Sequence, residues 1–480
     1  MRRLSIICGV LLALSLVLEA APAMAYQPPP GARFNVPRPW GNDTQRFELV
    51  RTVEKAIRKT RPTKKDPKPF ILISTFLMDR KKTTDALIGA CKRGVSVRVI
   101  FDEDIASRPS RRLITTLNAD NVKDRNGDGK PDHKPRRGPC NRKRHKVDAQ
   151  GKVVRDKTGD PVMVQPRKLM STKAALRSVK KPRSTPVTWG KDRSYVKKCS
   201  GSCRGAGGNM HSKFYVFSHS GKGKNVVIVS SSNLNMGGAL LGWNDMYVMT
   251  GRPKSVAAYK RIHLDMTDDV RAPVKKVQVN DGPFTSRFFP MRKATKRNDP
   301  TMQDLNKVKC TSAIGRTQVH VSMFYWKGKR GNYIADKLLS LAHRGCAVNV
   351  IYGAPSRQIA ARLRNAAAHH VINLYDSRWD LNDDGTADVR THAKYVLVKG
   401  TVGSDRSSWQ VWTGTQNWVA GSLSKGDENS LNIRLKSAYK KYFADWVRIR
   451  KHSRRLPYSQ YPPPANGKQF VGMRAPTLYP

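Results

Sequence analysis

Met210-His211-Ser212-Lys213, read M-H-S-K, and Thr391-His392-Ala393-Lys394, read T-H-A-K, are two copies of one short pattern. Each copy opens an apolar run rich in β-branched and aromatic residues, Phe214–Phe217 after the first and Tyr395–Val398 after the second. Such runs are typical of buried β-strands. One H-x-K triplet means little in a lysine-rich chain, but two copies that each begin a predicted strand indicate a duplicated unit.

A second apolar run follows in each copy, Val226–Val229 in one and Gln410–Trp412 in the other. A polar cluster closes each copy, Ser230-Ser231-Ser232-Asn233 in the first and Gly414-Thr415-Gln416-Asn417 in the second. Histidine, lysine, a small hydroxyl residue and asparagine therefore recur in the same order. The alternative is a duplicated structural β-hairpin whose histidines only cap strands.

The duplication extends to a strand–helix–strand unit upstream of each H-x-K. Apolar periodicity and glycine stop signals predict the strands and helices 69–78, 83–93 and 95–101, and again 318–325, 333–344 and 347–352. Ser74-Thr75-Phe76 matches Ser322-Met323-Phe324 within these units. Short strands alternating with helices predict an α/β fold made of two pseudo-symmetric halves.

The chain of 480 residues has room for several domains. The sequence predicts, in order, a signal peptide (1–25), a Pro-rich segment (26–44), a first half (45–270) with a basic insertion at about 133–208, a linker (271–300), a second half (301–455) and a Pro-rich tail (456–480). The insertion is polar and basic, which predicts a long loop. This loop either contacts a polyanion or is a solvent-exposed insertion with no binding role.

The first 25 residues have the layout of a secretory signal, with Arg2 and Arg3, an apolar core and Ala23-Met24-Ala25. The apolar core is too short for a stable membrane anchor, and no later stretch is long and apolar enough to span. We therefore expect a secreted, extracellular protein without a transmembrane segment in its mature chain, and a monomer.

Six cysteines follow the predicted signal, and an even number in an oxidising compartment indicates disulfides. Six cysteines allow fifteen pairings. We favour Cys199–Cys203 and Cys310–Cys346 because each pair is local, which leaves Cys91 for Cys140. A zinc site is the alternative, but the paired C-x-x-C spacing of zinc sites is missing.

Each half also contains one D-x-N-x-D-G-x-x-D loop, a spacing that suits calcium because oxygen ligands stand at positions 1, 3, 5 and 9. The predicted metal ligands are Asp124, Asn126, Asp128 and Asp132 in the first loop and Asp380, Asn382, Asp384 and Asp388 in the second. The glutamate expected at position 12 is absent from both, so an Asx-rich turn without metal is the alternative.

The formal net charge of +55 indicates an anionic partner, either nucleic acid, an anionic membrane surface or an anionic polymer. Charge alone does not choose among these partners.

Two α/β halves that each carry H-x-K and a hydroxyl-x-Asn turn resemble the phospholipase D superfamily of phosphodiesterases. The resemblance implies that each half is a mixed sheet flanked by helices and that both H-x-K segments converge on one phosphate. It also implies a phosphohistidine intermediate with no cofactor needed for catalysis, so that calcium would be structural.

The residue chemistry agrees with this reaction. Lys213 and Lys394 can neutralise phosphate oxygens, and the two imidazoles can act as nucleophile and as general acid and base. The resemblance assigns His211 as nucleophile and His392 as acid/base, although the sequence alone does not order them. The hydroxyl and amide side chains predicted to bind phosphate oxygens are Ser231, Asn233, Thr415 and Asn417.

The family also has a carboxylate that orients each histidine. Glu428 stands at the expected place in the second half, and the matching offset in the first half is Asn244, followed by Asp245. The sequence departs from the family's H-x-K-x-x-x-x-D pattern, because Ser218 and Lys399 hold the aspartate positions.

We therefore expect a secreted phospholipase D-like phosphodiesterase that hydrolyses a phospholipid head group, with peripheral contact to anionic surfaces. The alternatives are a secreted nuclease of the same superfamily and a catalytically silent polyanion-binding protein. Because both histidines and both lysines are present, the silent protein is the weaker alternative.

Overall fold

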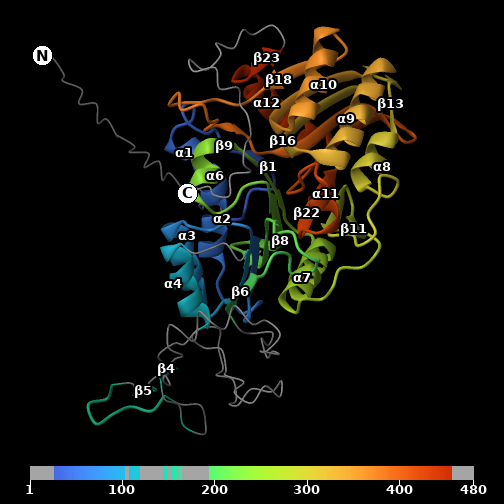
Figure 1. Cartoon of the computed structure of the whole chain (residues 1–480). Helices are drawn as coiled ribbons and strands as arrows, with labels where there is room; N and C mark the ends of the chain where they lie inside the picture. Colours follow the sequence, from blue (N-terminus) through green and yellow to red (C-terminus); the bar gives the residue numbers. More distant parts are fainter. Residues whose placement is uncertain are drawn as a thin grey trace, which may run out of the picture.

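The structure, a computed structural model, describes residues 26–102, 107–118, 144–145, 148, 153–160, 162–164 and 194–456. The predicted signal peptide, the first predicted calcium loop, Cys140 and residues 457–480 lie outside the described residues. Figure 1 shows two α/β halves lying against each other, the first in blue and green and the second in yellow to red.

A mixed sheet of seven strands organises the first half, in the order β1-β10-β8-β7-β2-β3-β6. Its strands are β1 (Gly31–Phe34), β2 (Phe70–Thr75), β3 (Ser96–Asp102), β6 (Tyr195–Cys199), β7 (Phe214–Ser220), β8 (Gly223–Ser230) and β10 (Asp245–Met249). β2 runs parallel to β3 and antiparallel to β7, so the strand that follows the first H-x-K lies beside the first predicted strand.

The second sheet has ten strands, with the path β11-β12-β22-β21-β20-β16-β17-β18-β23 and β13 beside β20. They are β11 (Val277–Asp281), β12 (Phe284–Phe289), β13 (Val308–Lys309), β16 (Gln318–Trp326), β17 (Ala347–Pro355), β18 (Asn373–Asp376), β20 (Lys394–Val402), β21 (Asp405–Gly414), β22 (Glu428–Ile433) and β23 (Arg454–Leu456). β16 is parallel to β17 and antiparallel to β20. This repeats the pairing of the first half and confirms the predicted duplication.

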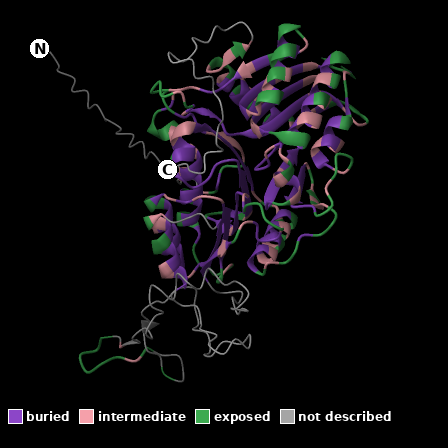
Figure 2. Cartoon of the chain, viewed as in Figure 1, coloured by how far each residue is buried: buried purple, intermediate pink, exposed green. Residues whose placement is uncertain are grey.

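Helices cover the outer faces of both sheets and also fill the space between them. The main helices are α2 (Glu48–Lys59), α3 (Lys81–Lys92), α4 (Arg108–Leu117), α6 (Met236–Leu241), α7 (Pro253–Thr267), α8 (Pro300–Asn306), α9 (Gly328–His343), α10 (Arg357–Ala368), α11 (Ala420–Ser424) and α12 (Lys436–Lys451). α2, α3 and α4 pack on the first sheet and α9 and α10 on the second. Their solvent faces are exposed while both sheets are buried (Figure 2).

One apolar cluster joins the two halves. It contains residues of α7 and α12 together with inner-face residues of both sheets, among them Val216, Trp243, Tyr395 and Trp446. Burial of apolar surface stabilises packed elements by roughly 25 cal/mol per Å², so this shared core fixes the position of one half relative to the other. Their relative position matters because each H-x-K segment lies at the boundary between the halves.

The structure differs from the sequence-based layout at three places. The Pro-rich segment contributes edge strand β1, which pairs with β10. The predicted linker contains β11 and β12, and β12 pairs with β22 of the second sheet. The basic insertion is not a loop at its end, because residues 195–199 form β6 beside β3.

Two of the favoured disulfides are confirmed, Cys199–Cys203 and Cys310–Cys346. The third pair involves Cys140, which lies outside the described residues. Among the helices that the structure describes, none has the length and apolar character needed to cross a membrane.

Candidate active site

Each histidine segment is held by the main chain of the opposite half. The N–H of His211 donates to the carbonyl of Asp427 at 2.9 Å, and the N–H of His392 donates to the carbonyl of Trp243 at 2.9 Å. The second contact belongs to a short parallel pair, β9 (Gly242–Trp243) with β19 (Arg390–Thr391). Two distant parts of the sequence therefore meet at each histidine.

The imidazole contacts cross between the halves in the same way. Nδ1 of His211 lies 2.9 Å from Oε2 of Glu428, the residue after Asp427. Nδ1 of His392 lies 2.8 Å from Oδ1 of Asn244, the residue after Trp243. The acid predicted in the second half thus orients the histidine of the first half, and the other histidine has an amide instead of a carboxylate.

The hydrogen bonds of Asn244 fix the tautomer of His392. The Asn244 amide nitrogen donates to the carbonyls of Gly238 and Gly242 at 2.9 and 3.0 Å, so its oxygen faces the imidazole. An amide oxygen only accepts. Nδ1 of His392 therefore carries the hydrogen, so in the neutral ring Nε2 is the nitrogen with the lone pair.

Glu428 remains ionised although it is buried. Burial would raise its pKa, but the charge and hydrogen bond of His211 and the charge of Lys213 outweigh burial and hold the pKa below its usual value. Burial lowers the pKa of His211, and Glu428 opposes that effect. At neutral pH an uncharged His211 donates Nδ1–H to an anionic Glu428, so its Nε2 has a lone pair available for attack.

The histidines differ in electrostatic environment. The pKa of His392 lies well below its usual value because of burial and because Lys394 and Lys213 are close, and the side chain that contacts its Nδ1 is the neutral amide of Asn244. Two imidazoles whose surroundings separate their proton affinities can divide the roles of nucleophile and acid between them.

Both lysines reach the same small region. Nζ of Lys213 donates to the carbonyl of His211 at 2.7 Å, and Nζ of Lys394 donates to the carbonyl of His392. Burial lowers the pKa of Lys213 to about 7, against the opposing charges of Glu428 and Asp102. Burial and the nearby Lys213 hold the pKa of Lys394 well below its usual value. A bound anion would relieve this repulsion between cations.

The predicted hydroxyl donors, Ser231 and Thr415, contact the side chains that orient the two imidazoles. Oγ of Ser231 donates to Oδ1 of Asn244 at 3.1 Å. The hydroxyl of Thr415 hydrogen-bonds Glu428 and lowers its pKa. Ser231 and Thr415 therefore occupy equivalent places, each supporting the side chain that orients a histidine.

The other predicted site residues, Asn233, Asn417 and Asp245, each have different contacts. Oδ1 of Asn233 accepts from the N–H of Leu77 at 3.3 Å, whereas Oδ1 of Asn417 is buried with no hydrogen-bond partner among the residues that the structure describes. Asp245 is buried beneath Thr413 and Tyr442, which both donate to its Oδ2. Burial raises the pKa of Asp245, with the hydrogen bonds from these side chains opposing it.

Two phenylalanines belong to the site and were not predicted. The Phe76 ring lies 5.2 Å from the His211 ring and 5.4 Å from Nζ of Lys213. The Phe324 ring lies 4.8 Å from the His392 ring and 5.0 Å from Nζ of Lys394. The repeated Ser-x-Phe triplets, 74–76 and 322–324, were the sequence signal that could have identified them.

The second predicted calcium loop is held by hydrogen bonds within the loop. Asp380, Asp384 and Asp388 each accept from a loop N–H, at 2.7, 2.7 and 2.8 Å. Across the described residues, no three or more His, Cys, Asp or Glu side chains are grouped to hold a metal ion. These hydrogen bonds are those of an Asx-rich turn, and calcium stays a prediction for both loops, the first of which lies outside the described residues.

Comparison with known proteins places the chain in a family. The family described as "Cardiolipin synthase, PLD-like domain" matches residues 65–264 and 311–448. Among curated proteins nothing matches.

Three of the solved structures similar to this chain are the following. Phosphatidylserine synthase of Haemophilus influenzae has a TM-score of 0.51 at 11% identity, with 90% of this chain and 89% of that chain covered. Polyphosphate kinase of Porphyromonas gingivalis has a TM-score of 0.45 at 11% identity, with 87% of this chain but only 50% of the kinase covered. Yeast tyrosyl-DNA phosphodiesterase has a TM-score of 0.40 at 10% identity, with 84% and 90% covered.

The family match extends over most of the chain and includes both H-x-K segments, and the first of these structures shares the two-half fold. The chain therefore belongs to the family of the cardiolipin synthase phospholipase D-like domain, and with it to the phospholipase D superfamily.

Proposed function

We propose that this protein is a phosphodiesterase that forms a phosphohistidine on His211 and uses His392 as general acid and base. The observation that carries the proposal is the crossed and unequal pairing of the two imidazoles, a carboxylate on His211 and an amide on His392. The carboxylate suits the ring that becomes cationic when it bonds phosphorus. The amide leaves His392 a stronger acid.

In the first step, Nε2 of His211 attacks phosphorus and the bond from phosphorus to the leaving oxygen breaks. Protonated His392 donates its Nε2 proton to that oxygen, which departs as an alcohol. Lys213 and Lys394 bind the non-bridging oxygens. The anionic substrate raises the pKa of His392, because it offsets the lysine charges that lower it.

In the second step, neutral His392 takes a proton from water, and the resulting hydroxide attacks phosphorus as the bond to His211 breaks. The products are a phosphomonoester and the starting enzyme, with both imidazoles restored. Glu428 stabilises the phosphohistidine between the two steps through its hydrogen bond to Nδ1 of His211.

The proposed substrate is a phospholipid whose head group is released to leave phosphatidic acid. The family description, which names a phospholipid-metabolising enzyme, supports this class. Secretion is proposed from the sequence of the first 25 residues, and the two disulfides are compatible with an oxidising compartment.

A nuclease is the second candidate, favoured by the formal net charge of +55. Contacts between lysine or arginine and phosphates release counterions, so affinity for nucleic acid falls steeply as salt rises. Binding to anionic vesicles depends on salt for the same reason, so binding alone does not separate the candidates and turnover is required.

The deciding experiment incubates the protein with phosphatidylcholine vesicles and, separately, with plasmid DNA, each with and without EDTA. Choline release with intact plasmid supports the phospholipase, and plasmid cleavage with intact lipid supports the nuclease. His392→Ala serves as the inactive control. Salt-dependent binding to plasmid DNA without turnover of either substrate would instead support the silent polyanion-binding protein.

A further inference from the structure

A short loop of the first half contacts the residues that lead into β22, the strand that begins at Glu428. Strand β6 ends at Cys199, which is bonded to Cys203, and the chain then runs against residues 425–427 of the second half. A Cβ on Gly205 would lie 1.9 Å from the carbonyl oxygen of Lys425, and one on Gly208 would lie 2.8 Å from the nitrogen of Gly426. The backbones are in direct contact, and only glycine permits this approach.

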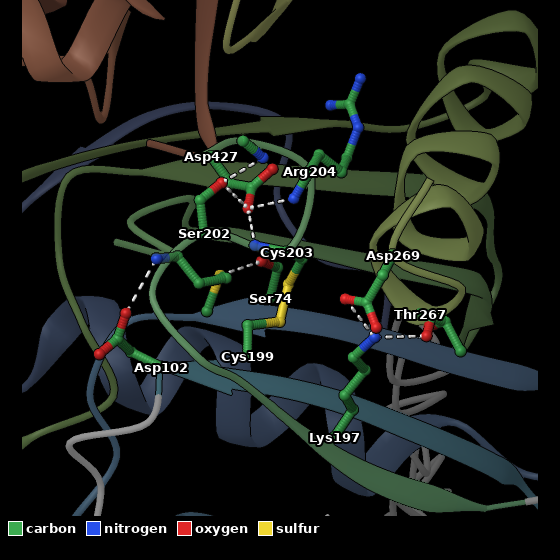
Figure 3. Close-up of a disulfide and its surroundings, with 12 residues drawn as sticks. Ser74, Asp102, Lys197, Cys199, Ser202, Cys203, Arg204, Thr267, Asp269 and Asp427 are labelled. Atoms are coloured by element: carbon green, nitrogen blue, oxygen red, sulfur yellow. Dashed lines mark hydrogen bonds and ion pairs between the residues drawn. A yellow bond between two sulfur atoms is a disulfide. The ribbon is translucent and has the colours of Figure 1, made fainter. Parts of the chain in front are cut away.

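The disulfide-closed loop, residues 199–203, presents its polar groups to one buried carboxylate. Oδ2 of Asp427 accepts from Oγ of Ser202 at 2.7 Å and from the N–H of Cys203 at 2.6 Å (Figure 3). The N–H of Arg204, just beyond the loop, lies 3.3 Å from the same oxygen. Asp427 is 1% exposed, so these donors replace water around its Oδ2.

Asp427 also holds the reacting segment through its main chain. Its carbonyl accepts from the N–H of His211, its N–H donates to the carbonyl of Asn209 at 3.0 Å, and its neighbour is Glu428. Asp102 supports the same segment by accepting from the N–H of Met210 at 2.8 Å. Asp427 therefore lies between the disulfide-closed loop on one side and both members of the His211–Glu428 pair on the other.

The equivalent place near His392 is built differently. Trp243, whose carbonyl accepts from His392, stacks on Trp40 at 5.5 Å and on His452 at 5.6 Å. Aromatic stacking and the Asn35 side chain, which donates to the carbonyl of Gly242 at 2.9 Å and accepts from the N–H of Asn244 at 2.8 Å, hold the His392 side. A loop closed by a disulfide holds the His211 side. A side chain that must stay in line for attack on phosphorus gains most from such a rigid support.

We propose that the disulfide-closed loop, acting through Asp427, positions Glu428 and His211 for attack on phosphorus. The loop residues are positioning residues that do not touch substrate. The rate effect rests on the proposed function, but the geometry of the His211–Glu428 pair is measurable without any substrate.

The test compares two double variants. Cys199→Ser/Cys203→Ser opens the loop, and Cys310→Ser/Cys346→Ser is the matched control on the far side of the second half. The cysteines of the control are separated by 36 residues, against 4 in the loop. Closing a longer loop restricts the unfolded chain more, so stability considerations alone predict the larger loss of melting temperature in the control.

Four quantities are measured for each variant: the melting temperature, kcat and KM on a chromogenic aryl phosphodiester, and the low-field proton resonance of the His211 Nδ1–H. That resonance is identified by its absence from His211→Ala. We expect the loop variant to lose the resonance and on the order of 100-fold in kcat, the scale of a misplaced reacting group, with KM little changed. The control should keep the resonance and kcat.

Ser202→Ala is the second variant, because it removes one donor to Asp427 and leaves the disulfide in place. It should lower kcat several-fold and broaden the same resonance. If the opened loop keeps both the resonance and kcat, or if the two double variants lose them equally, the positioning role is wrong. If the wild type turns over no phosphodiester while the resonance still depends on the loop, the proposed function fails and the positioning of the pair stands.

Discussion

Replacing Glu428 with glutamine tests the division of labour between the two histidines. The exchange keeps the shape of the side chain and removes its charge at the 2.9 Å contact with Nδ1 of His211. A hydrogen bond to a charged group contributes about 1.5–3 kcal/mol. Each tenfold change in rate corresponds to about 1.4 kcal/mol, so kcat/KM should fall about 10- to 150-fold.

The same substitution should also shift the pH dependence of kcat/KM in a defined direction. Glu428 is the group that raises the pKa of His211 against the effect of burial, so its loss lowers that pKa. Attack requires neutral His211, and the acidic limb of kcat/KM should therefore move to lower pH in Glu428→Gln. The assay is initial-rate hydrolysis of an aryl phosphodiester across pH, with circular dichroism to confirm folding.

Glu48→Gln is the matched control, because Glu48 begins α2 and pairs with Arg33 away from the imidazoles. It should leave both the rate and the acidic limb unchanged. A Glu428→Gln enzyme with an undiminished rate, or with its acidic limb unmoved or shifted upward, would refute the assignment of His211 as the carboxylate-supported nucleophile.

Three further outcomes are expected. His211→Ala and His392→Ala should each lower turnover by several orders of magnitude with the melting temperature retained, and near wild-type rates in either would exclude the two-histidine mechanism. Because burial lowers the pKa of Lys213 to about 7, kcat/KM should fall more steeply as pH rises through about 7 and Lys213 loses its charge, in addition to the fall that deprotonation of His392 causes; Lys213→Arg, which stays charged, should remove that additional fall. If calcium binds the second loop, EDTA and Asp384→Ala should lower the melting temperature, with activity lost only as the protein unfolds; immediate loss of turnover at unchanged melting would place the ion at the phosphate.

The duplicated core was predictable because its signals are local. β2, α3 and β3 return as β16, α9 and β17 with the same apolar periodicity and the same glycine after the helix. The H-x-K segments were recognisable for the same reason, since each begins a strongly apolar strand.

Strand β6 shows why some elements escaped prediction. Its sequence, Tyr-Val-Lys-Lys-Cys, looks like part of a basic loop. Lys197 is nevertheless fully buried, and its ammonium pairs with Asp269 at 2.7 Å and donates to the carbonyl of Thr267 (Figure 3). A buried charge is tolerated in a sheet when an ion pair or hydrogen bonds compensate it. Here the partners come from residues far along the sequence, so the local sequence does not reveal them.

The crossing of the orienting side chains was hidden for a related reason. Glu428 and Asn244 were identified by their offsets from the polar turns, but which histidine each one contacts depends on how the halves pack. The contacts join residues 217 and 148 positions apart. The unlike chemistry of the two partners, carboxylate and amide, acquires meaning only once each is matched to its imidazole.

The most direct test of the central claim is to trap the covalent intermediate. In His392→Ala, an aryl phosphodiester with a good leaving group needs no acid for the first step, whereas the second step lacks its base. Rapid acid-free quenching, proteolysis and mass spectrometry should then find the phosphoryl adduct on the peptide that contains His211, formed in one equivalent per active site. An adduct on any other residue, or hydrolysis that proceeds in single turnover with no adduct on His211, would contradict the account.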